Sequence, residues 1–369
     1  MSTTTVSSAM ISSGVIPTVE PTRNFLLDGD YTNWPEGVAF ASIAHTKYGP
    51  ALWQHQRSGS NTPFDVNRST NVPTIAQSGH QSSYSMEIDC TTAVGSPGST
   101  DYHEMRYHVS GTDFAHLHQQ TVTLNFWWYS TKTGTCSGTI RNSAQDRIYP
   151  FSFTVSSTNT WEEKSVTIDL DTSGTWLFTD ADKGCLVTFN LLAGSGRTAT
   201  AGSWGGTFAS GASSTANHAD STSNFVRIAQ VGLYKGSTAP SSFVGEPVAT
   251  VKDQVSYYVQ RWDYDQASDE HGMMGAGHVY NTSTVHFTKI FDKELRVAPS
   301  VTFSGSGTFE AYYRVSQAVF GTLTAGHIGK HGCRLTAPAA SGTPFTAGDA
   351  VDVRRDGTDA CFIMADARH

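Results

Sequence analysis

The stretch TVTLNFWWY, residues Thr121–Tyr129, decides the fold class of this chain. Apolar side chains recur at every second position, at Val122, Leu124, Phe126 and Trp128. A period of two is that of a β-strand, whose successive side chains point to opposite faces, and it does not fit a helix. The stretch therefore predicts a long strand with one buried face.

Similar alternation recurs along the chain and is interrupted by turns rich in Gly and Ser. It appears at residues 83–90, 164–170, 186–192, 225–234, 284–291, 299–303, 350–355 and 361–367. Aromatic residues make up 11% of the chain, and they suit a pleated, half-buried surface. Evenly spaced strands joined by polar turns predict an all-β protein made of antiparallel, jelly-roll-like sandwiches.

The length of 369 residues exceeds that of a typical single sandwich and accommodates two domains. Residues 236–247 read as a linker, and Val248, Val251, Val255 and Tyr258 then follow helical spacing, which predicts a short helix at the linker. The expected parts are an extended N-terminal arm, a jelly roll and a C-terminal sandwich, at residues 1–23, 24–247 and 248–369.

Composition excludes several function classes. A net charge of −8 does not fit a nucleic-acid binder, and no apolar stretch approaches the roughly 20 residues of a membrane span. The cysteines number five and include no CxxC pair, so we expect neither a disulfide framework nor a structural zinc site. No signal peptide is visible, which fits a protein made in a reducing cytoplasm.

The order of these segments resembles carbohydrate-binding-module-like jelly rolls as they occur in virion appendage proteins of tailed bacteriophages. The resemblance rests on Asn24–Tyr31, Thr121–Thr133, Asn159–Trp176 and Phe225–Phe243. The segment Glu294–Gly305 is similar to part of a C-terminal domain often attached to such proteins. The resemblance implies a non-enzymatic structural component of a phage particle, either a head or tail fibre or a decoration protein.

Two other functions remain open beside this one. The alternative is a host-adhesion protein that binds cell-surface glycans, and a third reading is a glycan-degrading enzyme. We expect location in the virion after assembly in the host cytoplasm, self-association as a homotrimer, and docking on other virion proteins through the arm. The apolar residues of the arm are Met10, Ile11, Val15 and Ile16.

The resemblance also implies a structural calcium ion, held by acids near the first strand and by an Asp in the last. Asp28 and Asp30 could serve, but the last strand carries Gln230 and no Asp. We therefore expect no cofactor.

Aromatic rings are the candidates for glycan binding, because sugars stack their C–H faces on flat, exposed rings. Trp53 and Trp204 are expected in loops, the latter in a long loop at residues 193–222 that also holds Phe208. Trp127 and Tyr129 lie on the strand face opposite Trp128, where packing against the domain or a partner subunit is the competing interpretation.

A candidate metal site is His116 with His118, which would share one face of a strand and could meet their copies on a three-fold axis. The competing interpretation is a pair of ordinary surface histidines. His327, His331 and Cys333 lack an evident fourth zinc ligand.

A glycoside hydrolase needs two carboxylates in a cleft. Adjacent acids on turns are usually solvated, and no catalytic motif is present. The sequence therefore predicts a non-enzyme, although these acid pairs are available: Glu162 with Glu163, Asp169 with Asp171, and Asp180 with Asp182.

Overall fold

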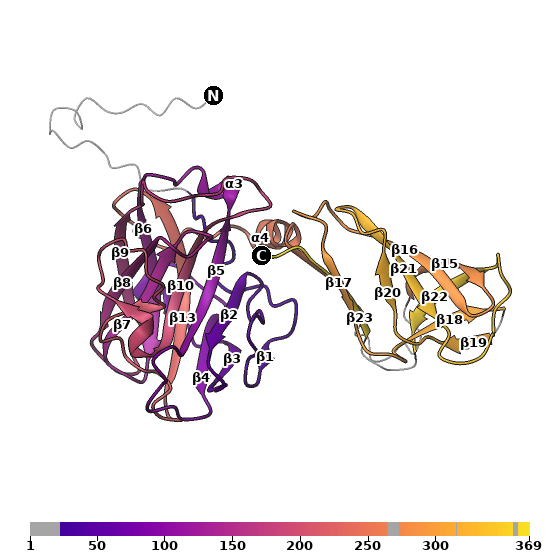
Figure 1. Cartoon of the computed structure of the whole chain (residues 1–369), viewed down its shortest axis with the longest axis horizontal. Helices are drawn as coiled ribbons and strands as arrows, with labels where there is room; N and C mark the ends of the chain where they lie inside the picture. Colours follow the sequence, from indigo (N-terminus) through magenta and orange to yellow (C-terminus); the bar gives the residue numbers. More distant parts are fainter. Residues whose placement is uncertain (1–22, 265–272, 315, 357–360) are drawn as a thin grey trace.

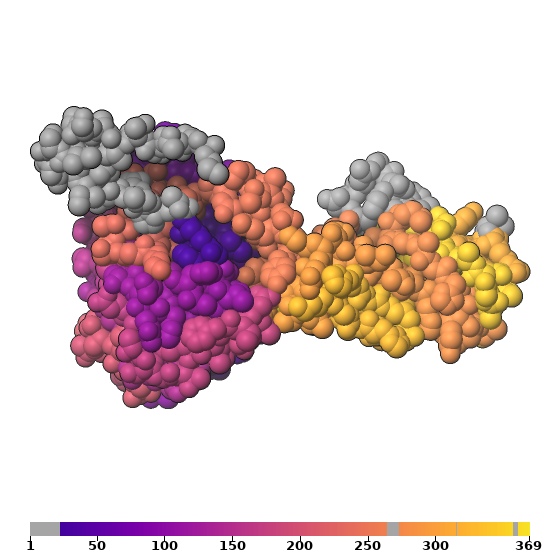
Figure 2. Space-filling view, turned by 90° about the horizontal axis from the view of Figure 1, so that it is seen from above, coloured from indigo at the N-terminus to yellow at the C-terminus, as the bar shows by residue number. Residues whose placement is uncertain are grey.

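The structure is a computed structural model, and it describes residues 23–264, 273–314, 316–356 and 361–369. The chain forms two β-sandwiches side by side, joined at a narrower waist (Figures 1 and 2). This confirms the predicted all-β class. The attachment residues Met10, Ile11, Val15 and Ile16 lie outside the described residues.

The N-terminal sandwich packs a six-stranded sheet on a five-stranded sheet, with antiparallel neighbours in both. The first sheet runs in the order β1 (Ala39–Phe40), β3 (Phe64–Ser69), β4 (Ser85–Cys90), β13 (Phe225–Lys235), β6 (Thr121–Ser130) and β9 (Glu162–Asp169). The second runs in the order β2 (Trp53–Ser58), β5 (Tyr102–Ser110), β10 (Lys183–Ala193), β7 (Gly134–Arg141) and β8 (Ile148–Val155).

Short elements lie between these strands. They are α2 (Ile75–Ser78), α3 (Gly111–Phe114), a 3-10 turn at Ser195–Arg197, and the two-residue strands β11 (Thr198–Ala199) and β12 (Gly211–Ala212). The last three belong to the predicted long loop, which is therefore partly ordered by its own backbone pairing.

The core of this sandwich is built on β6, as the alternation predicts. Val122, Leu124, Phe126 and Trp128 are each 0% exposed. The ring of Phe126 lies 4.8 Å from that of Phe189 on the opposite sheet. Fully burying one large apolar side chain contributes about 1.5–3 kcal/mol, so this row of residues holds the two sheets together.

The C-terminal sandwich begins after α4 (Val248–Ser256), which confirms the predicted linker helix. Its three-stranded sheet runs in the order β14 (Val259–Tyr264), β23 (Cys361–Asp366) and β17 (Ser300–Phe303). Its seven-stranded sheet runs in the order β19 (Ser316–Val319), β18 (Phe309–Tyr313), β22 (Ala350–Arg355), β15 (Met273–Asn281), β16 (Thr284–Ile290), β21 (Gly332–Pro338) and β20 (Thr324–Gly326).

The two sandwiches meet where the end of the chain returns to the N-terminal sandwich, beside α4 (Figure 1). The Arg368 side chain is 2% exposed, and it forms ion pairs with Glu36 and Asp366. It also donates to the Ala51 carbonyl at 3.0 Å. The Tyr48 hydroxyl donates to the His369 carbonyl at 2.8 Å. Charged and neutral hydrogen bonds therefore fix the joint.

All five cysteines are buried and unbridged. Within the described ranges, no helix has the length and apolar character needed to cross a membrane.

Candidate functional site

The outer face of the five-stranded sheet is polar, although it is largely covered. On β5, Met105, Tyr107 and Val109 enter the core, so the alternate residues Glu104 and Arg106 must point outward. Both outward side chains are nevertheless buried, at 0% and 6% exposure. A charged row that stays buried needs internal partners.

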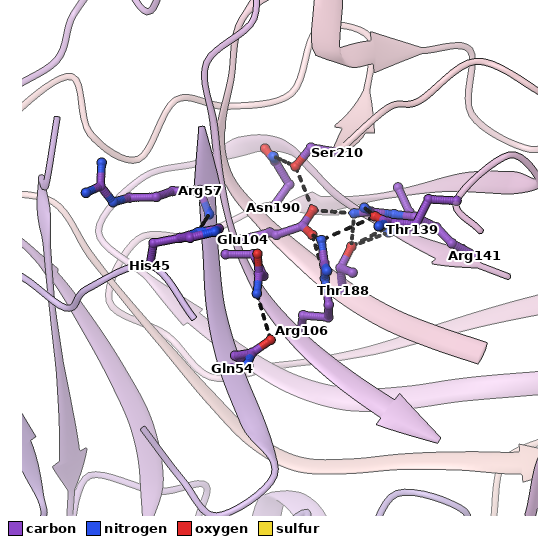
Figure 3. Close-up of polar contacts among 12 residues, drawn as sticks. His45, Gln54, Arg57, Glu104, Arg106, Thr139, Arg141, Thr188, Asn190 and Ser210 are labelled. Carbon is purple, nitrogen blue, oxygen red and sulfur yellow. Dashed lines mark hydrogen bonds and ion pairs between the residues drawn. The ribbon is translucent and has the colours of Figure 1, made fainter. Parts of the chain in front are cut away.

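Glu104 is the centre of that network (Figure 3). Its carboxylate accepts from Arg106 at 2.7 Å and from Ser210 at 2.9 Å, and it forms an ion pair with Arg141. Burial alone would raise the pKa of Glu104, but Arg141 and Arg106 outweigh burial and hold the pKa below its ordinary value. The carboxylate is therefore ionised, and it ties β5 and β7 to the loop that carries Ser210.

Further hydrogen bonds link neighbouring side chains on this face (Figure 3). Gln56 donates to the Gln54 side chain at 2.7 Å, and Gln54 donates to the Thr46 carbonyl at 3.1 Å. On the other side, Asn190 donates to the Ser210 hydroxyl at 2.8 Å. Each polar group is held in one orientation, which is the preorganisation that a binding surface needs.

An aromatic rim borders this network. The rings of Tyr102 and Phe208 are both half-buried, and their centres lie 5.3 Å apart. The guanidinium groups of Arg141 and Arg197 lie 4.9 and 5.1 Å from the Phe208 ring centre. Arg57 lies on the same sheet, one position from Ser58, the β-partner of Tyr102. Partly exposed rings beside fixed polar groups can hold a sugar.

Sequence reasoning placed Phe208 in a long loop but missed Tyr102 and the Glu104 network. A signal was available, because Tyr102–His108 alternates charged with apolar residues. Charged residues at every second position of a strand indicate either a solvated face or a built polar one. The choice between these depends on the loop at residues 194–212, which lies far away in sequence.

The prediction for Trp53 is wrong. Trp53 begins β2 and is not in a loop, and its ring is 1% exposed and stacked on Phe189 at 5.6 Å. The indole is part of the core, so it cannot stack on a sugar.

Trp204 does lie in a loop, and it is half-buried. Its indole nitrogen donates to the Asp169 carbonyl at 2.8 Å, and its ring lies 5.4 Å from Tyr149 and 5.9 Å from Trp176. Trp204 is a fixed, partly accessible ring away from the Tyr102–Phe208 rim.

Trp127 and Tyr129 lie on the outer face of the six-stranded sheet, as their alternation with Trp128 predicts. Trp127 is only 8% exposed and packs with Trp161 and Ala229. The Tyr129 ring is half-buried and lies 5.4 Å from that of Trp161. The domain itself covers Trp127, so its indole offers little surface to a ligand.

The strand predicted for His116 and His118 is wrong. These residues follow α3 in a turn, because Ser110 caps the helix by accepting from the Asp113 amide. His116 is exposed, and the ring of His118 packs 4.9 Å from Phe178. In the described part of the chain, no three His, Cys, Asp or Glu side chains are grouped to hold a metal ion.

The side chains at the implied calcium position are linked by hydrogen bonds. The Asp30 carboxylate accepts from Ser82 at 2.7 Å and lies 2.6 Å from the His80 imidazole. Gln230 directs its amide donors to Ser78 and Ser82 at 3.0 and 2.9 Å. Hydrogen bonds therefore occupy the Asp30 oxygens, whereas Gln230 Oε1 is buried and accepts no hydrogen bond from the described residues.

The acids available for hydrolysis are engaged in structural contacts. Glu162 forms an ion pair with Lys164, and Asp171 forms one with Arg147. Asp180 accepts from the Tyr257 hydroxyl of the C-terminal sandwich. These carboxylates therefore stabilise turns and the joint between the two sandwiches.

Comparison with known proteins gives likenesses of fold alone. No protein-family model matches the chain, and no curated protein matches its sequence. A family 61 carbohydrate-binding module in complex with β-1,4-galactotriose is 11% identical, with a TM-score of 0.29, and covers 58% of this chain and 99% of its own.

Two further solved structures are similar in the same way. The family 11 carbohydrate-binding module of a cellulosomal cellulase of Clostridium thermocellum is 11% identical, with a TM-score of 0.28, and covers 53% of this chain and 94% of its own. Discoidin II of Dictyostelium discoideum is 10% identical, with a TM-score of 0.17, and covers 78% of this chain and 82% of its own. Sequence identities and TM-scores this low show a likeness of fold and say nothing of the function of this chain.

Proposed function

We propose that this chain is a non-catalytic adhesion protein that binds a glycan at the rim formed by Tyr102 and Phe208. The observation that carries the proposal is the pairing of two half-buried rings with a rigid polar network on one sheet face. Rings offer stacking surface for sugar C–H groups, and the fixed polar groups offer hydrogen bonds to hydroxyls.

The Glu104 network contributes rigidity to this site. Because Glu104 binds both Arg141 and Ser210, the loop that carries Phe208 is tied to the sheet beneath it. A ligand therefore meets a ring pair that needs little ordering on binding, which lowers the entropic cost of association. A single shallow site of this kind is weak, and many copies on one particle would strengthen it through avidity.

The test is a glycan array probed with multivalent full-length protein, followed by titration of the best glycan. We expect Tyr102→Ala and Phe208→Ala each to weaken binding about two- to tenfold, since one aromatic contact is worth about 0.5–1.5 kcal/mol. Tyr84→Ala is the matched control, because Tyr84 is also half-buried but lies elsewhere, against Arg68. Equal binding by all three variants and wild type would rule out this rim.

We further propose that the protein is carried on a tailed-phage particle, as a head or tail fibre or decoration protein docked through residues 1–23. The resemblance of Asn24–Tyr31 and Glu294–Gly305 to appendage proteins supports this context. Deleting residues 1–22 should leave cooperative melting intact and abolish incorporation into particles. Light scattering of purified protein should give a trimer, and a stable monomer at high concentration would contradict the trimer.

A further inference from the structure

We infer that the outer face of the seven-stranded sheet of the C-terminal sandwich carries a second binding site, which accepts an acidic sugar residue. A hollow of about 160 Å³ opens there between β15, β16 and β21. Its lining includes His286, Thr288 and Arg334. This site is independent of the proposed Tyr102–Phe208 rim, which lies in the other sandwich.

The first feature of the site is a flat, exposed ring that is held in place. Tyr280 is 60% exposed, and its ring stacks on His286 with centres 4.4 Å apart and planes 22° apart. His278 meets His286 edge-on at 5.8 Å. The tyrosine thus has one supported face and a large exposed surface, an arrangement suited to stacking on the C–H face of a sugar.

The second feature is a guanidinium group without a counter-ion. Arg334 is exposed, and in the described part of the chain it makes no ion pair and no side-chain hydrogen bond. Elsewhere in this sandwich, Arg354 is paired with Glu310. Two acids on the same face lie farther along the sheet: Asp352 stands on β22, three strands from β21 and thus about 14 Å from Arg334, and Glu310 stands on β18, one strand beyond.

The spacing of these two features matches one sugar ring with a carboxylate. Arg334 lies opposite Thr288 across the ladder, and Thr288 is two residues from His286 on β16. Two residues along a strand span about 7 Å, so the guanidinium lies about one monosaccharide from the ring stack. The small side chains of Ala276 and Thr288 leave the space between them open.

The chemistry of these groups selects the ligand class. A planar guanidinium binds a carboxylate through two parallel N–H···O bonds, and an aromatic ring binds the sugar body. A uronic acid residue offers both groups at once. A neutral hexose lacks the carboxylate, and an inorganic anion lacks the ring face.

The experiment is titration of the full-length protein with glucuronate and galacturonate, and with glucose and galactose as neutral partners at matched ionic strength. Saturation-transfer NMR provides the readout. We expect the uronates to bind up to about fivefold more tightly than the hexoses, because an ion pair at an exposed guanidinium contributes no more than about 1 kcal/mol. Arg334→Gln should remove this preference, and Tyr280→Ala should weaken uronate binding about two- to tenfold.

Two matched variants separate this site from its surroundings. Tyr312→Ala removes another exposed ring of the same sheet, at 38% exposure, and should leave uronate binding unchanged. Phe208→Ala should also leave it unchanged, so failure of the proposed rim does not affect this test. Equal binding of uronates and hexoses, or unchanged uronate binding in Tyr280→Ala and Arg334→Gln, would each overturn the inference.

Discussion

The two sandwiches use arginine on their outer sheet faces in opposite ways. In the N-terminal sandwich, Arg106 and Arg141 are buried against Glu104 beneath a loop. In the C-terminal sandwich, Arg334 is exposed and has no acidic partner among the described residues. Arginine therefore has a structural role in the N-terminal sandwich and is a candidate ligand contact in the C-terminal sandwich. Burial and the presence of an acidic partner distinguish the two roles.

The strongest test of the scaffold is Glu104→Gln, which keeps the shape of the side chain and removes its charge. Arg141 is fully buried, so the substitution leaves it as an uncompensated charge. Removing one partner of a buried ion pair costs about 3–5 kcal/mol. We expect a loss of that size in the free energy of unfolding, measured by urea titration.

The control is Asp263→Asn, which removes the partner of Arg261 in an ion pair where the Asp263 side chain is 43% exposed. Exposed pairs contribute less than about 1 kcal/mol, so this variant should be nearly as stable as wild type. A Glu104→Gln protein as stable as Asp263→Asn would show that the network does not hold the sheet and loop together.

The next largest effect is expected at the joint between the two sandwiches. Arg368→Gln removes the ion pair to Glu36 and the contact with the Tyr48 ring, whose centre lies 3.7 Å from the guanidinium carbon. We expect a loss of about 2 kcal/mol, because charged hydrogen bonds in a buried site contribute about 1.5–3 kcal/mol. Calorimetry should resolve separate transitions for the two sandwiches, whereas an unchanged thermogram would contradict a coupled joint.

The local sequence pattern predicted those elements that are determined by neighbouring residues. The row from Val122 to Trp128 follows from the period of two, and α4 follows from helical spacing after the linker. Trp53 was misplaced because its burial depends on Phe189 of β10, a partner 136 residues away that no local signal names. His116 was misplaced because the Ser110 cap that starts a short helix before it was overlooked.

The candidate sites could not be predicted from local sequence patterns either, because they too depend on contacts between residues far apart in the chain. Whether Arg106 or Arg334 is free depends on which acids the topology brings near, and sequence spacing does not give strand order. The sequence did indicate that the implied calcium site is incomplete, because Gln230 stands where an acid is expected. The structure explains that departure through the hydrogen bonds of Asp30, His80 and Ser82.

A smaller effect, on the pH dependence of the free energy of unfolding, is expected from the His80–Asp30 pair. The hydrogen bond that the His80 ring donates to the Asp30 carboxylate raises the pKa of His80 above its ordinary value of 6.5. A raised folded-state pKa gives stability that is present below the unfolded pKa and lost as pH rises through the folded value. Urea titration should therefore show a larger deficit for His80→Gln at about pH 6 than at about pH 8. Equal deficits at both would contradict a charged His80.

The smallest effect on the free energy of unfolding is expected for Arg334→Gln, in contrast to Glu104→Gln in the other sandwich. Arg334 is exposed and makes no ion pair within the described residues, so its removal breaks no folded-state contact of its charge. Surface substitutions of this kind change the free energy of unfolding by no more than about 0.5 kcal/mol. Urea titration of this variant beside Glu104→Gln measures both values. A loss of stability as large as that of Glu104→Gln would mean that Arg334 is scaffold as well, and the contrast between the two faces would then be false.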